Sequence, residues 1–347
     1  MEEIKNEMGA IEILPGMTTE EMKALFFDKT ALVEPAYKVY QLNSKGHRYY
    51  YRKDDKGYPE FFPSVTTIID QTLPKAQHLI EWIANKGLEE AERYKMERAS
   101  YGTFMHAQFE RLLIERMYNL DTLKDELKSY IEANRLPDNF IYHADELKKD
   151  ILSFAQFVMD YDVRPIAVEI ALVHPEKKYA GMIDLPCTMN WKGERIAALV
   201  DFKSGRKGFY ESCEIQLHMY RDMWNVNFPN LPIEKVFNFA PKDWRKKPTY
   251  HFKDQTDSVN AAKIPALLVL AAIEDGKKDN IFTSVSGTIM LDAKEVDLEK
   301  NVITMTLAEV VKNHKNDTPE VATEVAPESE ETKQESITSL LNSEIEI

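Results

Sequence analysis

Apolar residues recur with helical spacing in two segments of the chain. In the first segment they are Met105, Phe109, Leu112 and Leu113, and in the second they are Leu147, Ile151, Phe154 and Val158. Such spacing places each set on one face of a helix. The pattern therefore predicts helices over Tyr101–Tyr118 and Asp145–Tyr161. Further helices are predicted over about Ala76–Ala99, Ser212–Val226 and Asp257–Asp275, and Thr18–Met22 is typical of a capped helix start.

Apolar runs bounded by turn residues predict strands between these helices. The predicted strands are Tyr37–Tyr40, His47–Arg52, Ile166–His174, Tyr179–Met189, Arg195–Lys203, Lys235–Ala240 and Thr249–Phe252. Asn190-Trp191-Lys192-Gly193 supplies a hairpin turn between two of them. Because helices precede and follow the group of three central strands, we expect an α/β fold with a mixed central sheet flanked by helices.

The composition is that of a soluble globular protein, with 44% apolar and 29% charged residues among 347. Apolar runs such as Ile264–Ile273 are too short to span a bilayer, and Met1–Glu7 lacks the apolar core of a secretion signal. We therefore expect a cytoplasmic protein with no membrane partner. Its two cysteines, Cys187 and Cys213, exclude a disulfide framework and any four-cysteine zinc or iron–sulfur site within one chain.

The net charge of −14 is concentrated near the C-terminus. Residues 317–347 hold nine acidic side chains and one basic, a net −8, so the other residues carry −14 + 8 = −6. This balance argues against a broad surface that coats duplex DNA, but it allows a narrow channel with a basic lining. We expect a disordered acidic tail from Asn316 onward. Its apolar end, residues 337–347, is either a peptide that docks on a protein partner or a solvated terminus.

Two carboxylates fall where the sequence otherwise predicts buried strands. Asp184 and Asp201 are unfavourable there unless they are paired or bind a metal ion. On adjacent strands they provide oxygen ligands suited to Mg²⁺ or Mn²⁺, and the Phe202 carbonyl is placed to add another. Lys203 shares a strand face with Asp201, so its ammonium can orient water and stabilise charge on a phosphate. An Asp-x-Lys pair alone is usually an exposed strand end, but with Gly181-x-x-Asp184 one hairpin earlier it indicates catalysis.

Four other residues are candidates for the site, and Glu169 and His106 also have a structural interpretation. Glu169 is either an outward-facing strand residue or a residue that widens the metal site or holds Lys203. Gln216 and Tyr220 lie one helical turn apart, and their position after the lysine suggests that they orient the lysine or a carboxylate, or contact a phosphate. His106 is either a packing residue or an imidazole ligand that would favour Mn²⁺.

Aromatic and basic residues recur together in residues 49–53 and 242–247. Stacking faces beside cations suit single-stranded nucleic acid, which makes Trp244, Arg245 and Lys246 candidate contacts. An ordinary hairpin surface gives the same pattern. The sequence has no Gly-x4-Gly-Lys-Ser/Thr loop, so ATP is not an expected partner.

In combination, these motifs resemble the PD-(D/E)XK nuclease superfamily, and more narrowly its RecB-type exonuclease branch, which includes phage exonucleases and the mitochondrial genome-maintenance exonuclease. The hallmark is Gly-x-x-x-His, Gly-x-x-Asp, Asp/Glu-x-Lys and Gln-x-x-x-Tyr, in that order. It falls here on Gly102 and His106, Gly181 and Asp184, Asp201 and Lys203, and Gln216 and Tyr220. The segment from Pro63 to Thr66 is similar to a Pro-Ser-Val-Thr segment of the exonucleases, and its Ser64 and Thr66, together with Tyr220, are expected to contact nucleic acid. The resemblance covers about residues 60–255.

The resemblance implies a restriction-endonuclease-like core over residues 63–315, after an N-terminal elaboration over 1–62 and before the tail at 316–347. It implies that His106, Asp184 and Asp201 are metal ligands and that Lys203 is the catalytic lysine. The implied activity is Mg²⁺- or Mn²⁺-dependent hydrolysis of DNA by an exonuclease that acts on single strands or ends, in replication, recombination or repair.

The chain departs from some relatives of that branch. It lacks the four cysteines of their iron–sulfur cluster and the length of a helicase fusion. A compact enzyme, phage-encoded and working in a bacterial or phage-infected cell, fits these features. Two alternatives stay open: a catalytically silent DNA-binding or recombination-accessory module on the same fold, and an interaction protein that acts through its acidic tail.

Overall fold

A central β-sheet organises the part of the chain that the structure describes. The structure, a computed structural model, describes residues 32–44, 47–53, 59–206, 208–276, 281–285 and 302–306. The predicted helix start at 18–22 and the acidic tail at 316–347 lie outside these residues, and the proposed domain boundaries remain predictions.

The central sheet has five strands in the order β10-β9-β8-β7-β4. Their bounds are β4 (Arg164–Pro165), β7 (Leu185–Trp191), β8 (Glu194–Phe202), β9 (Lys235–Pro241) and β10 (Tyr250–Asp254). Only β8 and β9 are parallel, so the sheet is mixed, as expected. The β7–β8 hairpin closes at the predicted Asn190–Gly193 turn, where Lys192 and Gly193 have positive φ angles.

Two predicted strands are interrupted at acidic residues. The segment Tyr179–Met189 is not one strand: β6 (Tyr179–Ile183) pairs with β5 (Ile170–His174), whereas β7 pairs with β8. At the break, the Asp184 side chain accepts a hydrogen bond from the Phe202 backbone N–H at 2.7 Å. The predicted strand Ile166–His174 begins at Ile170 instead, because Glu169 has a φ of +49°, which strands do not contain.

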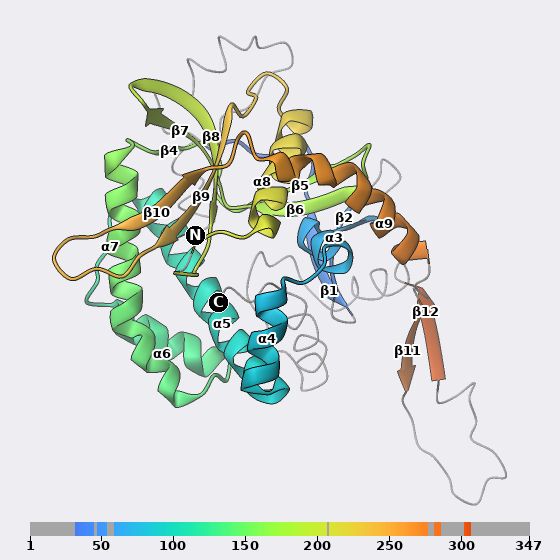
Figure 1. Ribbon diagram of the computed structural model, residues 1–347, viewed down its shortest axis with the longest axis horizontal. Helices are drawn as coiled ribbons and strands as arrows, with labels where there is room; N and C mark the ends of the chain where they lie inside the picture. Colours follow the sequence, from blue (N-terminus) through green and yellow to red (C-terminus); the bar gives the residue numbers. More distant parts are fainter. Residues whose placement is uncertain are drawn as a thin grey trace, which may run out of the picture.

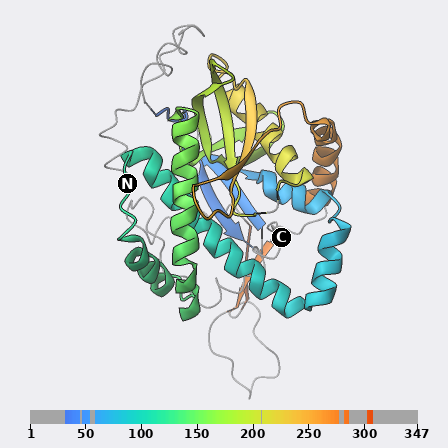
Figure 2. The same ribbon diagram turned by 60° about the vertical axis from the view of Figure 1, so that its left-hand side comes forward.

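The helices cover both faces of the central sheet (Figures 1 and 2). The described helices are α3 (Val65–Thr72), α4 (Gln77–Lys86), α5 (Leu88–Glu115), α6 (Leu123–Ala133), α7 (Ala144–Asp160), α8 (Glu211–Asn227) and α9 (Ile264–Gly276), with 3-10 turns at Asp138–His143 and Val259–Lys263. Of these, α4 packs against α5, and α6 packs against α7, rather than on the sheet. The predicted boundary near residue 100 is wrong. The chain breaks instead at Gly87, whose φ of +87° suits a glycine, and α5 then runs unbroken to Glu115. The last predicted helix also starts later, because its first residues form the second 3-10 turn.

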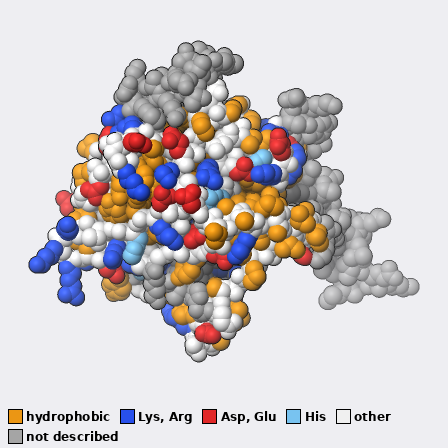
Figure 3. Space-filling view, turned by 45° about the horizontal axis from the view of Figure 1, so that its top comes forward, with side chains coloured by type: hydrophobic (Ala, Val, Ile, Leu, Met, Phe, Trp, Pro, Cys, Tyr) orange, Lys and Arg blue, Asp and Glu red, His pale blue; other side chains and the backbone are white. Residues whose placement is uncertain are grey.

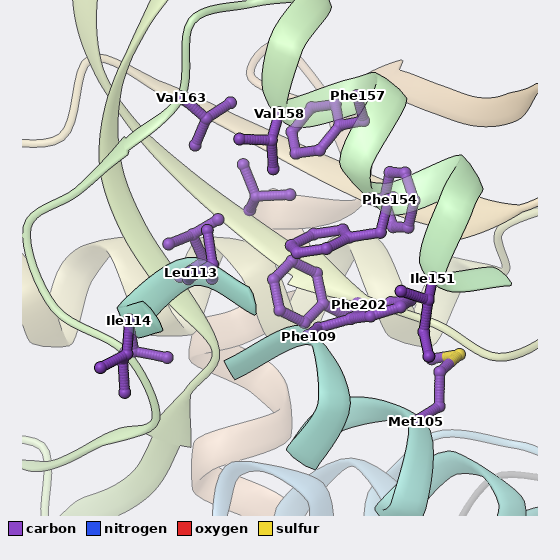
Figure 4. Close-up of a cluster of buried hydrophobic side chains, with 14 of the residues drawn as sticks. Met105, Phe109, Leu113, Ile114, Ile151, Phe154, Phe157, Val158, Val163 and Phe202 are labelled. Carbon is purple, nitrogen blue, oxygen red and sulfur yellow. The ribbon is translucent and has the colours of Figure 1, made fainter. Parts of the chain in front are cut away.

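Each face of the sheet has its own hydrophobic core. On one face, α5 and α7 contribute stacked aromatic rings, among them Phe109 and Phe154 with centroids 4.1 Å apart, and Phe202 of β8 packs edge-on against both (Figure 4). On the other face, α8 packs against β8 and β9 and against the separate β5–β6 hairpin, and α3 and α9 add apolar side chains to the same core. The alternation of β8 therefore buries Phe202 on the α5 side and turns Asp201 and Lys203 toward α8.

A three-stranded antiparallel sheet precedes α3. It consists of β1 (Tyr40–Ser44), β2 (His47–Lys53) and β3 (Pro59–Pro63). The strand predicted at His47–Arg52 is confirmed, whereas β1 starts at the last residue of the strand predicted at Tyr37–Tyr40. A bridge between Ser64 and Ala180 joins this sheet to β6, and Tyr50 and Phe62 are buried against β5 and β6. Two short strands, β11 (Ile281–Val285) and β12 (Val302–Thr306), form a separate hairpin. Within the described residues, no helix has the length and apolar character that crossing a membrane requires.

Candidate metal centre

A pocket of about 480 Å³ lies where α3, α5, α8, β6, β8 and the N-terminal sheet meet. Its lining includes every residue that the sequence suggested for catalysis or metal binding: His106, Glu169, Asp184, Asp201, Phe202, Lys203, Gln216 and Tyr220. Near the middle of the face shown in Figure 3, acidic side chains lie beside a histidine among lysines and arginines. The fold thus brings residues that are far apart in sequence to one place.

Three of these residues form a compact set of possible metal ligands. One ligand atom from each of His106, Glu169 and Asp184 lies within 4.8 Å of the other two. The His106 Nδ1 atom is 3.4 Å from Glu169 Oε1 and 3.8 Å from Asp184 Oδ1. Glu169, whose role the sequence left open, therefore lies with the metal-ligand candidates.

Local backbone structure aims these carboxylates at His106. The positive φ of Glu169 is unfavourable for a residue with a side chain. It is compensated in part by a hydrogen bond from the Glu169 N–H to the Asp184 carbonyl at 2.9 Å. Asp184 Oδ2 accepts the Phe202 N–H, which leaves Oδ1 toward the histidine. Both acids are thus held by the backbone at the β6–β7 break.

The electrostatics of this group favour a bound cation. Burial lowers the pKa of His106, but the Asp184 and Glu169 carboxylates outweigh it and raise the pKa to about 9. Burial, with help from the Glu169 charge, raises the pKa of Asp184 to about 6 although His106 opposes the shift. The pocket therefore favours a positive charge at its centre. Without a cation there, the charged forms of the neighbouring carboxyl groups are unfavourable.

Asp201 lies between this group and the lysine. It is 2% exposed, and its Oδ2 accepts a hydrogen bond from Asn238 Nδ2 at 2.9 Å. The Lys203 Nζ atom is 3.3 Å from the same oxygen. Burial raises the pKa of Asp201 to about 7, against the effect of Lys203. Asp201 is not one of the three residues grouped within 4.8 Å, so its part as a ligand remains a prediction.

A chain of hydrogen bonds continues from Lys203 into α8. Lys203 Nζ donates to Gln216 Oε1 at 2.8 Å, and Gln216 Nε2 donates to the Tyr220 hydroxyl oxygen at 3.0 Å. Gln216 and Tyr220 are both buried and lie on one face of the helix. Of the roles expected for this glutamine, contact with the lysine is the one present in the geometry.

Only some of the residues predicted to contact nucleic acid line the pocket. Thr66 and Tyr220 line the pocket. Ser64 is 1% exposed and its hydroxyl caps α3 by accepting the Thr67 N–H, so it is a structural residue rather than a surface contact. Trp244, Arg245 and Lys246 do not line the pocket. Trp244 donates a hydrogen bond from Nε1 to Ser153 Oγ on α7 at 3.0 Å, and Arg245 and Lys246 are exposed in the same loop.

Sequence reasoning missed polar residues of the pocket. Glu110 lines it from the turn of α5 that follows His106, and the i, i+4 spacing of the two residues could have indicated it. Gln41 and Arg48 reach it from the N-terminal sheet. Arg48 directly precedes the aromatic and basic residues 49–53, which was the one local signal for it, but nothing in the sequence of that sheet shows that it packs beside the motifs.

The residues of the pocket fit a divalent cation. Two carboxylates and an imidazole are close enough to share one ion, and Mg²⁺ and Mn²⁺ both accept oxygen ligands. The imidazole ligand favours Mn²⁺ over Mg²⁺. The donor set can thus hold a divalent ion, and which metal it binds stays a prediction. His106 must lose its proton before it can bind an ion.

Comparisons with known proteins give only distant similarities. No protein-family model and no curated protein matches the chain. A crystal structure of a candidate exonuclease from Eubacterium rectale is similar over 46% of this chain and 66% of that one, with 13% identity and a TM-score of 0.29. The structure of SSO0001 is similar over 52% of this chain and 87% of that one, with 13% identity and a TM-score of 0.24. These values do not define a family for the chain.

Proposed function

We propose that this protein is a nuclease that hydrolyses DNA phosphodiesters with Mg²⁺ or Mn²⁺. The proposal is supported above all by one observation: three possible metal ligands and an Asp–Lys pair line the same pocket. Hydrolysis of a phosphodiester requires stabilisation of charge on the phosphate and a positioned water. The pocket contains side chains for each of these tasks.

Each residue has a distinct part in this proposal. His106, Glu169, Asp184 and Asp201, with the Phe202 carbonyl, hold the ion. When bound, a divalent ion polarises the phosphate and lowers the pKa of a bound water. Lys203 stabilises the negative charge that builds up on the phosphate oxygens. Gln216 fixes the direction of the lysine through their 2.8 Å hydrogen bond, and Tyr220 fixes the glutamine.

The finer assignment follows from the order of the sequence motifs. All four motifs of the RecB-type PD-(D/E)XK branch occur in sequence, which favours an exonuclease that acts on single strands or DNA ends. We propose roles in phage or bacterial replication, recombination or repair, with DNA as the partner and with a second protein held by the acidic tail. The alternative is a silent DNA-binding module, which would need no lysine at position 203.

Replacement of Lys203 by alanine tests the proposal. With end-labelled single-stranded DNA and Mn²⁺, we expect cleavage to fall by about 10²- to 10³-fold, because a charge-stabilising group is lost. Calorimetry should show that Mn²⁺ still binds, since the ligand group is intact. Asp184→Asn should reduce both binding and cleavage, and EDTA should abolish cleavage by the wild-type protein.

Lys124→Ala is the matched control, because this lysine is exposed on α6, outside the pocket. It should cleave like the wild-type protein. Wild-type activity in Lys203→Ala would refute the catalytic assignment, and a wild-type protein that is inactive with both metals would favour the silent module. Resistance of circular DNA, with a ladder from one labelled end of linear DNA, would establish the exonuclease mode.

A further inference from the structure

Arg48 brings a cation to the pocket from outside the sequence motifs. It belongs to β2 of the N-terminal sheet and lines the same pocket as the carboxylates of Glu169 and Asp184. Among the described residues of that lining, only Lys203 is another lysine or arginine. The two cations differ in their surroundings, because Lys203 lies beside Asp201 and Gln216.

The Arg48 backbone is anchored at the start of α3. Its carbonyl accepts hydrogen bonds from the Ser64 N–H at 3.2 Å and from the Thr67 hydroxyl at 3.3 Å. Thr66, between these two residues, lines the pocket as well. The Arg48 backbone is therefore held in place at the edge of the pocket, and the Thr66 side chain lines the same pocket.

Arg48 also differs from other arginines near the site. Arg52 pairs with Glu60, and Arg206 pairs with Glu146 and Asp150. No carboxylate within the described ranges forms an ion pair with Arg48. Its neighbour is the buried Tyr50 phenol, whose pKa is raised by burial and by the charges of Glu169 and Asp184 and is lowered by Arg48. The tyrosine thus experiences the arginine charge and the carboxylate charges together.

This arrangement is suited to an anion that must approach carboxylates. The unesterified oxygens of a phosphodiester are repelled by nearby acidic groups and need a cation that is not already neutralised by a side chain. A guanidinium offers several donors to phosphate oxygens, and a neighbouring hydroxyl can add one more.

We propose that Arg48, with the Thr66 hydroxyl beside it, binds a phosphate group of the substrate strand. In this proposal the N-terminal sheet forms one side of the substrate-binding pocket. This inference rests on the proposed function and deepens it, because it assigns a ligand to Arg48, which lies outside the nuclease motifs. The phosphate is either an internal phosphodiester or a terminal phosphate.

Binding of a labelled single-stranded oligonucleotide by the full-length protein in EDTA tests the proposal without cleavage. Arg48→Ala should weaken binding by about 10- to 100-fold, the range for loss of hydrogen bonds from a charged group. Arg48→Lys should recover part of the affinity because the charge returns. Lys38→Ala, an exposed residue just before β1 and outside the pocket, is the control and should change binding by no more than about twofold.

Neutral methylphosphonate linkages, introduced one at a time, identify the phosphate. At the linkage held by Arg48, the wild-type protein should lose affinity and Arg48→Ala should not. If 5′-phosphorylated ends instead bind better than 5′-hydroxyl ends only when Arg48 is present, the group is a terminal phosphate. Equal sensitivity of both proteins at every linkage and end would overturn the proposal, as would unchanged binding by an Arg48→Ala protein with a wild-type melting curve.

The two proposals can fail separately. A protein that cleaves DNA with Mn²⁺ but binds equally well without Arg48 retains the nuclease function and loses this subsite. A protein whose binding depends on Arg48 but which cleaves nothing retains the phosphate subsite and loses the nuclease function. The binding assay and the cleavage assay therefore report on different claims.

Discussion

Two glycines of the sequence motifs have different environments at the residue scale. A Cβ atom on Gly181 would lie 2.6 Å from Cε1 of Tyr220, closer than such atoms normally approach. A Cβ on Gly102 would lie 3.5 Å from Ser204 Oγ, an ordinary contact. Gly181 is therefore needed because the ring of Tyr220 packs directly on its backbone, whereas the chain has room for a methyl group at Gly102.

We predict that Gly181→Ala reduces cleavage by about 10-fold or more and destabilises the protein by about 1–3 kcal/mol, as overpacking of a core does. The added methyl group displaces the tyrosine ring and breaks its hydrogen bond with Gln216, which positions Lys203. Cleavage rates and urea unfolding measure the two effects.

Gly102→Ala is the matched control for this change. It should keep wild-type cleavage and slightly increase stability, because alanine is favoured over glycine inside a helix. Equal effects of the two substitutions would contradict the packing argument. Tyr220→Phe, which keeps the ring and removes the hydroxyl, separates the loss of the hydrogen bond from the displacement of the ring.

Sequence motifs identified most of the pocket at this scale because their spacing reflects strand and helix geometry. Asp201 and Lys203 share a strand face, and Gln216 and Tyr220 share a helix face, so local periodicity predicts each pair. The positive φ of Glu169 could not be predicted, since it depends on the backbone of Asp184 across the chain. Arg48 was missed because its place is fixed by contacts with α3.

At the scale of elements, an ion-pair network joins α5 and α7 to the loop that follows Lys203. Arg98 of α5 donates to the Ser204 carbonyl at 3.0 Å, and Arg206 pairs with Glu146 and Asp150 of α7. Glu146 also accepts from His143. The network holds the chain directly after the catalytic lysine candidate to the two helices that cover that face of the sheet.

We predict that Glu146→Gln destabilises the protein by about 1–2 kcal/mol at pH 7, a range reduced for solvent screening because the side chain is partly exposed. Burial alone would raise the pKa of Glu146, but His143, Arg98 and Arg206 lower it to about 2 from an ordinary value of 4.5. A lowered carboxyl pKa contributes stability above the unfolded pKa, and this contribution is lost as pH falls through the folded pKa.

The stability difference between wild-type and Glu146→Gln proteins should therefore be constant above about pH 5 and shrink between about pH 4.5 and pH 2. Urea unfolding across this pH range measures it. Glu90→Gln removes an exposed partner of Arg93 and should change stability little at any pH. A pH-independent difference for Glu146→Gln would show that packing, and not charge, holds the network.

Element boundaries were predicted well where periodicity alone sets them and poorly where long-range contacts do. The strands β8 and β9 match their predicted ranges closely, because a buried strand reads as a continuous apolar run. The segment Tyr179–Met189 also reads as a single run. Its division at Asp184 depends on the Phe202 N–H, which lies 18 residues away in the sequence.

At the scale of the whole molecule, the sequence predicted an α/β fold with a mixed sheet but not which parts surround the pocket. The order of helices and strands indicates the class, since helices must cover an apolar sheet. The N-terminal sheet was predicted as an elaboration, yet Gln41 and Arg48 place it at the pocket. Composition cannot reveal such an arrangement, because it results from packing between the sheet and β6.

Removal of residues 316–347 tests whether the function lies in the pocket or in the acidic tail. We predict that Mn²⁺-dependent cleavage persists, because every candidate ligand lies elsewhere in the chain. The truncated chain has a net charge of −14 + 8 = −6. Its repulsion of DNA is therefore weaker, so single-stranded DNA should bind a few-fold more tightly at low salt and equally at high salt.

A full-length variant whose nine tail carboxylates are replaced by amides or other neutral groups separates charge from length. It should bind DNA as the truncated chain does if electrostatic repulsion is the cause, and its affinity should lose the same dependence on salt. Loss of cleavage on truncation, with a wild-type melting curve, would contradict a pocket that acts alone. That result would instead support a protein that works through the partner bound by its tail.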